Sequence, residues 1–419
     1  MQRFIRAVCL MLIVVTGSCA IAKAQHALTW DEVKARFESD NPTLRAGKLG
    51  VDEFRAQETT AFLRPNPNLA LNVDQINPFD GGPPHSTFGS LLTVAAASYL
   101  HERRHKRELR LESAKGATEI AEDAQADLER TLLFTMRMAF VQALQGKAVL
   151  ALAKENLAYY DKVLEVNRER YKAGSIAQMD LDRLELQRIQ YLADLQTADV
   201  NLRTAKIQLL ALLNDQTPVD QFDVAGPYEF AAQVASPEEY RRFAMESRPD
   251  LKAALRGIDK AETDHRLAMA NGSTDPTIGF DVGRNPPIDQ YIGFSVSVPL
   301  RIFDRNQGEK LRTQIDIDRN RRVADAARAQ VYSDVDSAYA TVNSAIVLLR
   351  PYKEMYLAQA ERVRDTVSFA YQHGGVSLLD FLDAQKEYRD TELNYLNLIG
   401  TYLIAASQMN LAVGREVIQ

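Results

Sequence analysis

The chain of 419 residues repeats itself at an offset of 200 to 209 residues. The clearest match needs no gap: residues 171–176 (YKAGSI) align with residues 371–376 (YQHGGV), and Asp180 aligns with Asp380. Three further matches precede it in the same order. They are residues 29–32 with 236–239, 41–44 with 248–251, and 66–69 with 274–278. Four matches in one order indicate an internal duplication, so the fold is built from two copies of one unit.

Each copy contains one very long segment that favours helix. Residues 101–172 and 307–372 hold almost no proline or glycine and place apolar residues three and four positions apart, which is the pattern of an amphipathic helix. At about 1.5 Å per residue each is a rod of roughly 100 Å, which no compact domain buries. We therefore expect long helical hairpins of the coiled-coil type. The shorter helices expected beside the rods are 42–63 with 176–214, and 249–271 with 376–413.

Four short segments have the composition of strands. They lie at about 67–75, 88–97, 277–284 and 290–298. Apolar and polar residues alternate in three of them, as Leu69, Leu71 and Val73 do with their neighbours; the segment 88–97 alternates poorly. Each is about as long as a tilted strand needs to cross the apolar core of a membrane. A half-buried strand in a soluble sheet has the same pattern, so alternation leaves both interpretations open.

If these strands lie in lipid, one chain does not suffice. A transmembrane barrel has to close, because an open edge leaves backbone amides unpaired in lipid, and closure takes about eight strands or more. Several chains would then pool their strands, with the loops 76–87 and 284–289 outside the cell. The predicted fold class is mainly α with a small β part: duplicated long-helix hairpins and four transmembrane strands per chain.

Residues 1–24 have the pattern of a secretory signal peptide, with a basic start, an apolar run over 7–15 and an A-x-A sequence at 22–24. An alternative is a lipoprotein signal in which Cys19 is acylated. Both cysteines, Cys9 and Cys19, lie in this segment. A chain cleaved after it therefore has no disulfide, catalytic thiol or cysteine metal site. Downstream, no apolar stretch approaches the roughly 18 residues of a transmembrane helix.

Removal of this segment, with its three basic residues, lowers the formal charge from −6 to −9. A negative charge argues against nucleic acid as a partner. The rest of the chain divides into four parts: a first repeat over 25–214 with its hairpin at 101–214, a linking segment over 215–235, a second repeat over 236–414 with its hairpin at 307–413, and a short tail over 415–419.

Together these features resemble the TolC family of outer-membrane efflux proteins over essentially the whole chain after residue 24. The resemblance rests on the duplicated unit, on Leu28-Thr29 followed by Asn41-Pro42, on the two Tyr-x-x-Gly turns and on residues 379–385 (LDFLDAQ). It implies a homotrimer whose strands form one barrel in the outer membrane and whose helices continue it as a tunnel through the periplasm. The implied partners are a periplasmic adaptor and an inner-membrane pump of the RND type.

A closer resemblance lies in residues 298–308 (VPLRIFDRNQG). They are similar to the strand-to-helix junction in outer-membrane components of cobalt-zinc-cadmium exporters. This implies a passive conduit for heavy-metal cations or other small toxic compounds. Two other functions fit parts of the pattern: a soluble periplasmic coiled-coil adaptor or scaffold, and an exit duct for type I protein secretion.

The family resemblance implies two sets of functional residues. The hairpin tips that contact an adaptor would be Gly174, Ser175, Gly374 and Gly375. The narrowest point of a closed periplasmic aperture would be formed by Asp380, Asp383, Tyr371 and Asp180. A purely structural role also fits both sets, because any helical hairpin favours glycine at its turn and aspartate is favourable near any helix start.

The aperture pattern is incomplete in this chain. In the first repeat Arg183 stands where Asp383 would be, and Val376 occupies a position where some relatives carry a basic latch residue.

His101 and His105 stand four positions apart at the expected start of a long helix, where they would share one face. Two ligands without a third make no metal site, so we expect the segment 101–107 (HERRHKR) to be a basic collar at the inner face of the membrane or a solvated helix start. No motif of a serine hydrolase, a zinc protease or a phosphate-binding loop occurs. We expect neither an enzyme nor a bound metal or cofactor.

Overall fold

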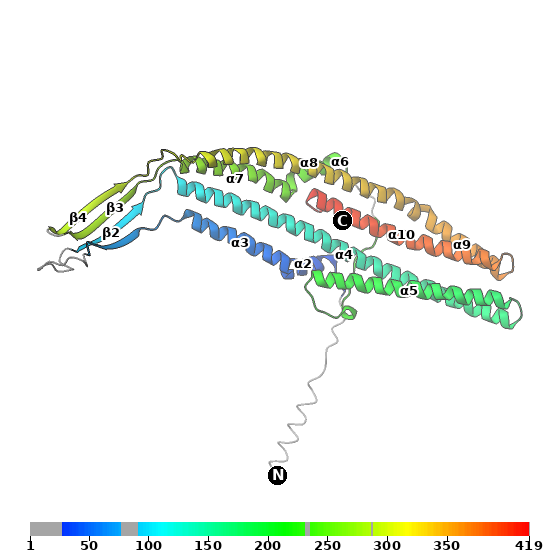
Figure 1. Cartoon of the computed structure of the whole chain (residues 1–419). Helices are drawn as coiled ribbons and strands as arrows, with labels where there is room; N and C mark the ends of the chain where they lie inside the picture. Colours follow the sequence, from blue (N-terminus) through cyan, green and yellow to red (C-terminus); the bar gives the residue numbers. More distant parts are fainter. Residues whose placement is uncertain (1–26, 77–90, 231–234, 286–287, 419) are drawn as a thin grey trace, which may run out of the picture. The chain divides into compact units, whose positions relative to one another are not determined.

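The computed structural model describes residues 27–76, 91–230, 235–285 and 288–418. It is mainly helical with one small sheet, which confirms the predicted fold class (Figure 1). The first repeat runs α2 (Trp30–Asp40), α3 (Pro42–Phe62), β1 (Asn68–Asp74), β2 (Leu92–Leu100), α4 (Lys106–Lys172) and α5 (Gln178–Leu212). A short 3-10 helix, η1 (Val219–Gln221), follows. The second repeat runs α6 (Pro237–Ser247), α7 (Pro249–Asn271), β3 (Thr277–Asn285), β4 (Ile288–Ser297), α8 (Gln307–Pro351), the π-helical turn η2 (Tyr352–Tyr356), α9 (Leu357–Gln372) and α10 (Leu378–Val413).

The described residues group into two compact units. Among the described residues, unit 1 comprises 27–41, 135–230 and 345–404, and it contains both helical hairpin turns. Unit 2 comprises the described residues of 42–134, 235–344 and 405–418, and it contains the sheet. The long helices α4, α8 and α10 contribute residues to both.

Each repeat opens with a helix that its own side chains cap. At α2 the Thr29 hydroxyl accepts a hydrogen bond from the Glu32 amide at 3.4 Å, and the Glu32 carboxylate accepts one from the Thr29 amide at 2.8 Å. At α6 the Ser236 hydroxyl accepts from the Glu239 amide at 3.3 Å. These bonds satisfy amides that have no partner within the helix, so they fix where the helix starts.

The residue before the proline of α3 and of α7 holds the end of a distant helix. Within unit 1, Asn41 Nδ2 donates to the carbonyl oxygen of Leu212 at the end of α5, at 2.9 Å. Within unit 2, Arg248 Nη1 donates to the carbonyl oxygen of Ala412 near the end of α10, at 3.2 Å. Helix ends leave carbonyls without intrahelical partners, and the Asn41-Pro42 and Arg248-Pro249 sequences supply the missing donors at equivalent places.

The four strands form one antiparallel sheet in the order β1-β2-β3-β4. Residues that pair across antiparallel strands share a face, and one row across the sheet consists of Leu71, Ala95, Val282 and Ile292. The next apolar row ends on Phe294, which is 82% exposed. One face of the sheet is therefore apolar and uncovered by any described part of this chain.

The second strand and the start of the long helix differ from the prediction. β2 ends at Leu100, three residues later than expected, and pairing with the segment before β3 continues to His101, whose amide donates to the Pro276 carbonyl at 2.9 Å. Arg104 and His105 then adopt positive φ angles of 61° and 55°, and α4 starts only at Lys106. The proposed helical pair of His101 and His105 is wrong, because a turn separates the two residues.

Two other expectations differ from the structure. The segment 307–372 is not one uniform α-helix: a π-helical turn follows Pro351, a residue that removes a helix hydrogen bond. Contrary to the expectation, α10 is long and apolar enough to cross a membrane by length and composition alone, although half of its most apolar stretch is buried as in a core helix. The predicted signal peptide, most of the loop 76–87 and part of the loop 284–289 lie outside the described residues.

Candidate functional site: the ends of the helical hairpins

The turn between α4 and α5 is built on Gly174. Its φ of +74° is a left-handed conformation that strains residues with a side chain. The amide of Gly174 donates to the Tyr171 carbonyl at 2.8 Å, and the amide of Ser175 donates to the Arg170 carbonyl at 2.8 Å. Both are carbonyls of the last turn of α4 that would otherwise lack partners, so the turn also caps the helix.

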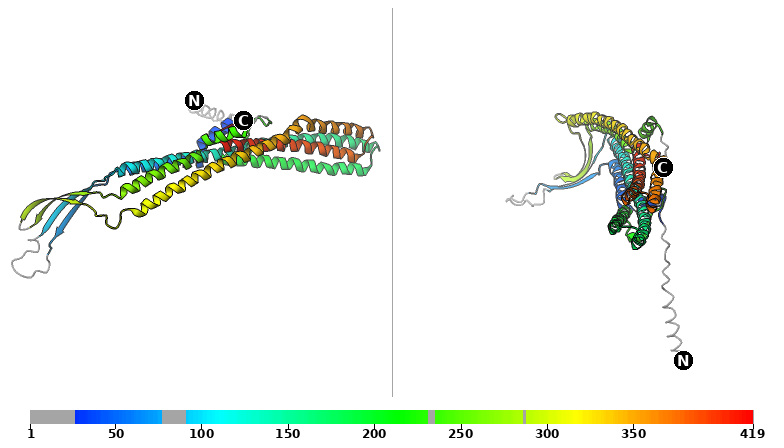
Figure 2. Two further views of the ribbon diagram at one scale, coloured as in Figure 1. Left: turned by 90° about the horizontal axis from the view of Figure 1, so that it is seen from above. Right: turned by 90° about the vertical axis from the view of Figure 1, so that its right-hand side faces the viewer.

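The turn between α9 and α10 has the same geometry. Gly374 has a φ of +73°, and the amide of Gly375 donates to the Ala370 carbonyl at 2.8 Å. Gly174, Ser175, Gly374 and Gly375 are all exposed, and the left-hand view of Figure 2 shows both hairpins ending at the same end of the helices. The repeated Tyr-x-x-Gly sequence therefore encodes two equivalent turns.

Asp380 belongs to a capping box that the sequence pattern had not singled out. Its carboxylate accepts from the Ser377 amide at 3.1 Å and from the Ser377 hydroxyl at 2.7 Å, and its own amide donates to the Ser377 hydroxyl at 3.2 Å. These bonds hold the pKa of the Asp380 carboxyl below its usual range, so it is charged at neutral pH. The aligned helix α5 has Ala177 at the capping position and no side-chain cap.

Residues 379–385 divide between the surface and the core. Leu379, Asp380 and Asp383 are exposed, whereas Phe381, Ala384 and Gln385 are buried. Helical periodicity produces this division, and it leaves both carboxylates on the solvent side of α10. No described side chain of this chain pairs with Asp383.

Tyr371 lies in the core between the two hairpins and is only 7% exposed. Its hydroxyl donates to Asn167 Oδ1 on α4 at 3.0 Å, and its ring stacks on Phe381 with centroids 4.8 Å apart. Burial raises the pKa of this hydroxyl, the nearby Arg170 guanidinium opposes the rise, and Asp180 adds to it. Tyr371 and Asp180 are thus neighbours, although Tyr371 faces inward.

A shared core joins the two hairpins around Tyr371. It combines residues of α4, α5, α9 and α10, and its buried members are Tyr160, Leu164, Leu181, Leu184, Tyr191, Tyr371, Leu378 and Phe381. Gln385 of α10 adds a polar contact, because its Nε2 donates to the Ser368 hydroxyl of α9 at 3.0 Å. The position of one hairpin end is therefore coupled to that of the other.

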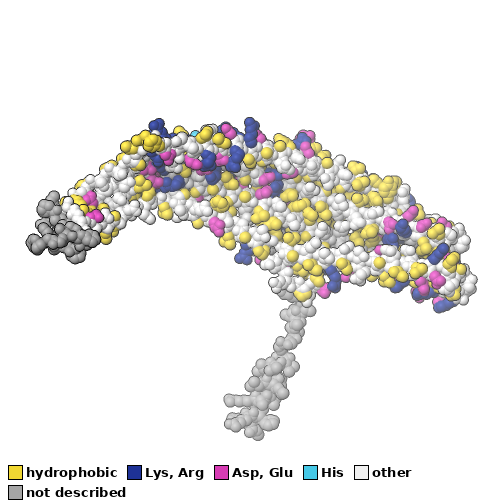
Figure 3. Space-filling model, in the orientation of Figure 1, with side chains coloured by type: hydrophobic (Ala, Val, Ile, Leu, Met, Phe, Trp, Pro, Cys, Tyr) yellow, Lys and Arg dark blue, Asp and Glu magenta, His cyan; other side chains and the backbone are white. Residues whose placement is uncertain are grey.

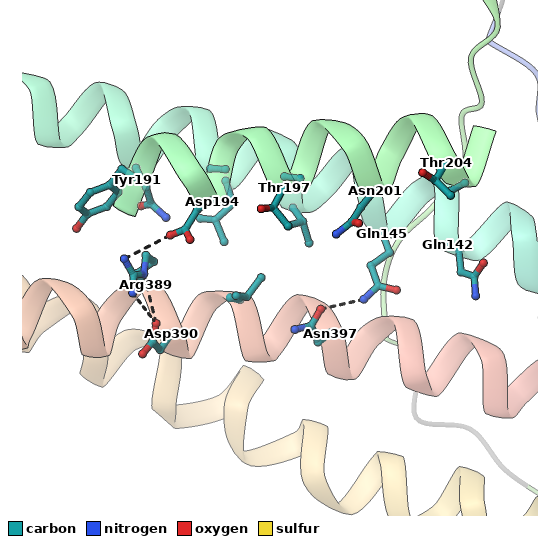
Figure 4. Close-up of a pocket in the computed structure, with 18 of the residues that line it drawn as sticks. Gln142, Gln145, Tyr191, Asp194, Thr197, Asn201, Thr204, Arg389, Asp390 and Asn397 are labelled. Atoms are coloured by element: carbon teal, nitrogen blue, oxygen red, sulfur yellow. Dashed lines mark hydrogen bonds and ion pairs between the residues drawn. The ribbon is translucent and has the colours of Figure 1, made fainter. Parts of the chain in front are cut away.

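A polar groove lies between α4, α5 and α10, with a volume of about 700 Å³. In Figure 4 the carboxylates of Asp194 and Asp390 point toward the guanidinium of Arg389, at N to O distances of 3.4 and 3.2 Å. Further along the groove, Gln145 Nε2 donates to Asn397 Oδ1 at 2.9 Å. Arg389 offsets the two carboxylates, so the groove is not a concentrated cation site. Sequence reasoning missed it because its residues come from three separate helices.

The turn geometry permits a direct prediction. We expect Gly374→Ala to destabilise unit 1 by about 1–2 kcal/mol, because a side chain at positive φ is strained. Gly50→Ala is a matched control: it lies in helix α3 with nothing within 4 Å of the added atom, so it should stabilise by about 0.5–1 kcal/mol. Thermal unfolding of the detergent-solubilised protein measures both. Equal shifts for the two variants would contradict the strained turn.

The chain combines long helical hairpins with a small sheet whose apolar face no described part of the chain covers, and such a face is expected of strands that contact lipid. Comparison with known proteins agrees: the family model described as outer membrane efflux protein matches residues 36–215 and again residues 242–415. The chain belongs to the outer membrane efflux protein family, and it is an outer-membrane protein that extends into the periplasm. This family assignment favours a channel over the soluble adaptor that the sequence left open.

Two curated relatives cover most of the chain. The cobalt-zinc-cadmium resistance protein CzcC of Cupriavidus metallidurans is 22% identical over 94% of this chain and 91% of its own. The outer membrane protein TolC of Escherichia coli is 20% identical over 95% of this chain and 84% of its own. Both extend over each of the two repeats.

Two solved structures share the fold. The structure of CusC has a TM-score of 0.76 at 18% identity and covers 92% of each chain. The open state of the MtrE outer membrane channel of Neisseria gonorrhoeae has a TM-score of 0.75 at 17% identity, covering 93% of this chain and 89% of that one.

Proposed function

We propose that three copies of this chain form the exit duct of a tripartite efflux system for heavy-metal cations, and that the duct performs no chemistry of its own. The observation that carries the proposal is the sheet. Its apolar face is uncovered, and β1 and β4 each have an edge without a strand partner among the described residues. In lipid such edges must pair, and copies of the same chain supply complementary edges in a closed ring.

Oligomerisation has its own test. Native mass spectrometry of the protein extracted in mild detergent should give the mass of three processed chains. A monomer mass under conditions that preserve known outer-membrane oligomers would contradict the proposal.

Heavy-metal cargo is supported by the cobalt-zinc-cadmium resistance for which CzcC is named and by the similarity of residues 298–308 to exporters of that class. The test is deletion of the gene, followed by growth in cobalt, zinc and cadmium salts and measurement of cellular metal. We expect lower tolerance and higher metal content, both restored by the wild-type gene. Unchanged metal tolerance combined with lost secretion of a protein would instead favour a type I secretion duct.

The hairpin ends are proposed as the working parts of the duct. Gly174, Ser175, Gly374 and Gly375 are exposed in hydrogen-bonded turns, which suits them to dock a periplasmic adaptor coupled to an RND-type pump. Asp380 and Asp383 are exposed one turn apart on α10 and would ring the periplasmic aperture of a trimer. Asp180 would lie beside them, and Tyr371 would act from the core by holding the two hairpins in register.

A further inference from the structure

In unit 2, several contacts hold together the segments that connect the helices to the sheet. Arg107 stacks on the ring of Phe62 at 4.3 Å. The buried Lys106 binds Asp275 at 2.6 Å, and Asn306 Nδ2 donates to the Ala268 carbonyl at 2.8 Å. The ends of α3 and α7 and the starts of α4 and α8 therefore lie at one level, which we call the junction collar (residues 62–64, 100–107 and 298–306).

Three exposed arginines of the junction collar have no side-chain partner within the described chain. They are Arg64, Arg104 and Arg305. Of the carboxylates near them, Glu102 binds Arg110 at 2.5 Å and Glu108 binds Arg107 at 2.9 Å, while the exposed Asp304 accepts a hydrogen bond from the Asn306 amide at 2.8 Å and offsets one of the positive charges. The collar therefore carries uncompensated positive charge although the whole chain is negative.

The same collar exposes large apolar side chains. Phe303 is 90% exposed, Leu300 is 80% exposed and Ile302 is 61% exposed. They follow directly on β4, whose apolar face carries Phe294. In Figure 3 yellow apolar and dark blue basic side chains lie next to each other where the helices lead toward the sheet. The apolar face of the strands thus continues into the collar and ends among arginines.

We propose that the junction collar binds the anionic phospholipid headgroups of the periplasmic leaflet, with Phe303 and Leu300 inserted among the acyl chains and Arg64, Arg104 and Arg305 on the phosphates. Aromatic side chains favour the level of the headgroups, and each basic residue near an anionic surface adds to binding. The collar lies at the end of the strands that leads into the helices, which is the periplasmic end. Its positive charge therefore faces the headgroups of the periplasmic leaflet. The inference rests on the outer-membrane placement of the sheet.

Tryptophan fluorescence separates the inference from that placement. The chain has one tryptophan, Trp30, so Trp30→Phe gives a silent background for Phe303→Trp and, as a control in the strands, Phe294→Trp. In bilayers of brominated phosphatidylglycerol we expect bromine near the headgroup to quench the fluorescence of Phe303→Trp. Bromine deep in the acyl chains should quench the fluorescence of Phe294→Trp. Quenching at 294 without any at 303 would overturn the collar alone, whereas no quenching at either would reject the membrane placement.

Charge variants test headgroup selectivity. The triple variant Arg64→Gln, Arg104→Gln and Arg305→Gln should weaken retention of phosphatidylglycerol by about fivefold for each arginine, measured by native mass spectrometry. Retention of phosphatidylethanolamine should change little. The matching Arg→Lys variant should keep wild-type retention, because the charges remain.

The control is a triple Arg→Gln variant with the same loss of charge away from the collar. Its substitutions are at the exposed Arg45, Arg322 and Arg362. It should leave lipid retention unchanged. If the control and the collar variant lose phosphatidylglycerol equally, or if the wild type retains both lipids equally, the proposal is wrong.

Discussion

Replacing Asp380 and Asp383 together by asparagine should weaken block of the reconstituted channel by multivalent cations by about tenfold or more, which is about 1.4 kcal/mol or more. In the proposed trimer the two positions would place six carboxylates around one axis at the aperture, and a ring of like charges attracts cations strongly. Asparagine is the appropriate replacement because its side-chain oxygen can still accept the Ser377 hydrogen bonds that cap α10. Alanine would combine loss of charge with loss of the cap.

The matched control for this experiment is Glu165→Gln with Asp182→Asn. Both are exposed acids of the other hairpin, formed by α4 and α5, and Asp182 accepts from Gln178 in a way that asparagine preserves. Planar-bilayer conductance and cation block should match those of the wild type. If the aspartate variant also behaves as the wild type does, Asp380 and Asp383 lie outside the constriction and Asp380 serves only to cap its helix.

Replacing Arg248 by methionine should lower the stability of unit 2 by about 3 kcal/mol, the low end for removing one partner of a buried ion pair. Arg248 is 3% exposed and binds Asp250 at 2.6 Å and Asp334 at 2.8 Å, in addition to the Ala412 carbonyl. The variant leaves all three acceptors without this donor. We expect the low end of the energy range for buried ion pairs because the two carboxylates are about one-third exposed.

Arg241→Met is the control, because Arg241 forms a similar two-bond contact with Asp336 at 2.8 and 2.7 Å but both side chains are well exposed. Exposed pairs contribute less than about 1 kcal/mol. Thermal unfolding of the two variants should therefore differ clearly. Similar losses of stability would mean that burial of Arg248 has no energetic consequence.

The pH dependence of the Arg248 effect has a definite sign. Burial alone would raise the pKa of Asp250, but hydrogen bonds from Arg248 hold it below the ordinary value, with help from Arg130. A lowered pKa stabilises the fold above the unfolded value of about 3.9, and this stabilisation is lost as pH falls through the folded value. The stability difference between the wild type and Arg248→Met, measured by thermal unfolding across pH, should therefore shrink below about pH 4. A constant difference would exclude the ion pair as its source.

Much of the fold could be predicted from periodicity and repetition. The long helices, the paired turns and the strand pattern arise from local preferences, and residues 171–176 and 371–376 fold alike because both place glycine where φ is positive. The junction at 101–105 could not be predicted, because no proline or glycine marks it. It is fixed by pairing with Pro276 and by the contact of Lys106 with Asp275, both distant in sequence.

The candidate site was predictable as a set of positions but not as a set of interactions. The family resemblance brought Asp380 and Tyr371 to attention, yet it could not show that Asp380 caps a helix and that Tyr371 is buried against Asn167. The spacing of Ser377 and Asp380 is a capping signature that was present in the sequence. The contact of Tyr371 with Asn167 joins separate hairpins and leaves no local signal.

The helix-end contacts of Asn41 and Arg248 have a consequence for how the gene can be divided. Each contact joins two residues of the same repeat, because Asn41 binds Leu212 and Arg248 binds Ala412. A chain interrupted between residues 215 and 235 would keep both contacts, and two half-length polypeptides expressed together would each retain the closure of their own ends. A half-length ancestor, present in twice as many copies, could have been held together in the same way before the halves were fused.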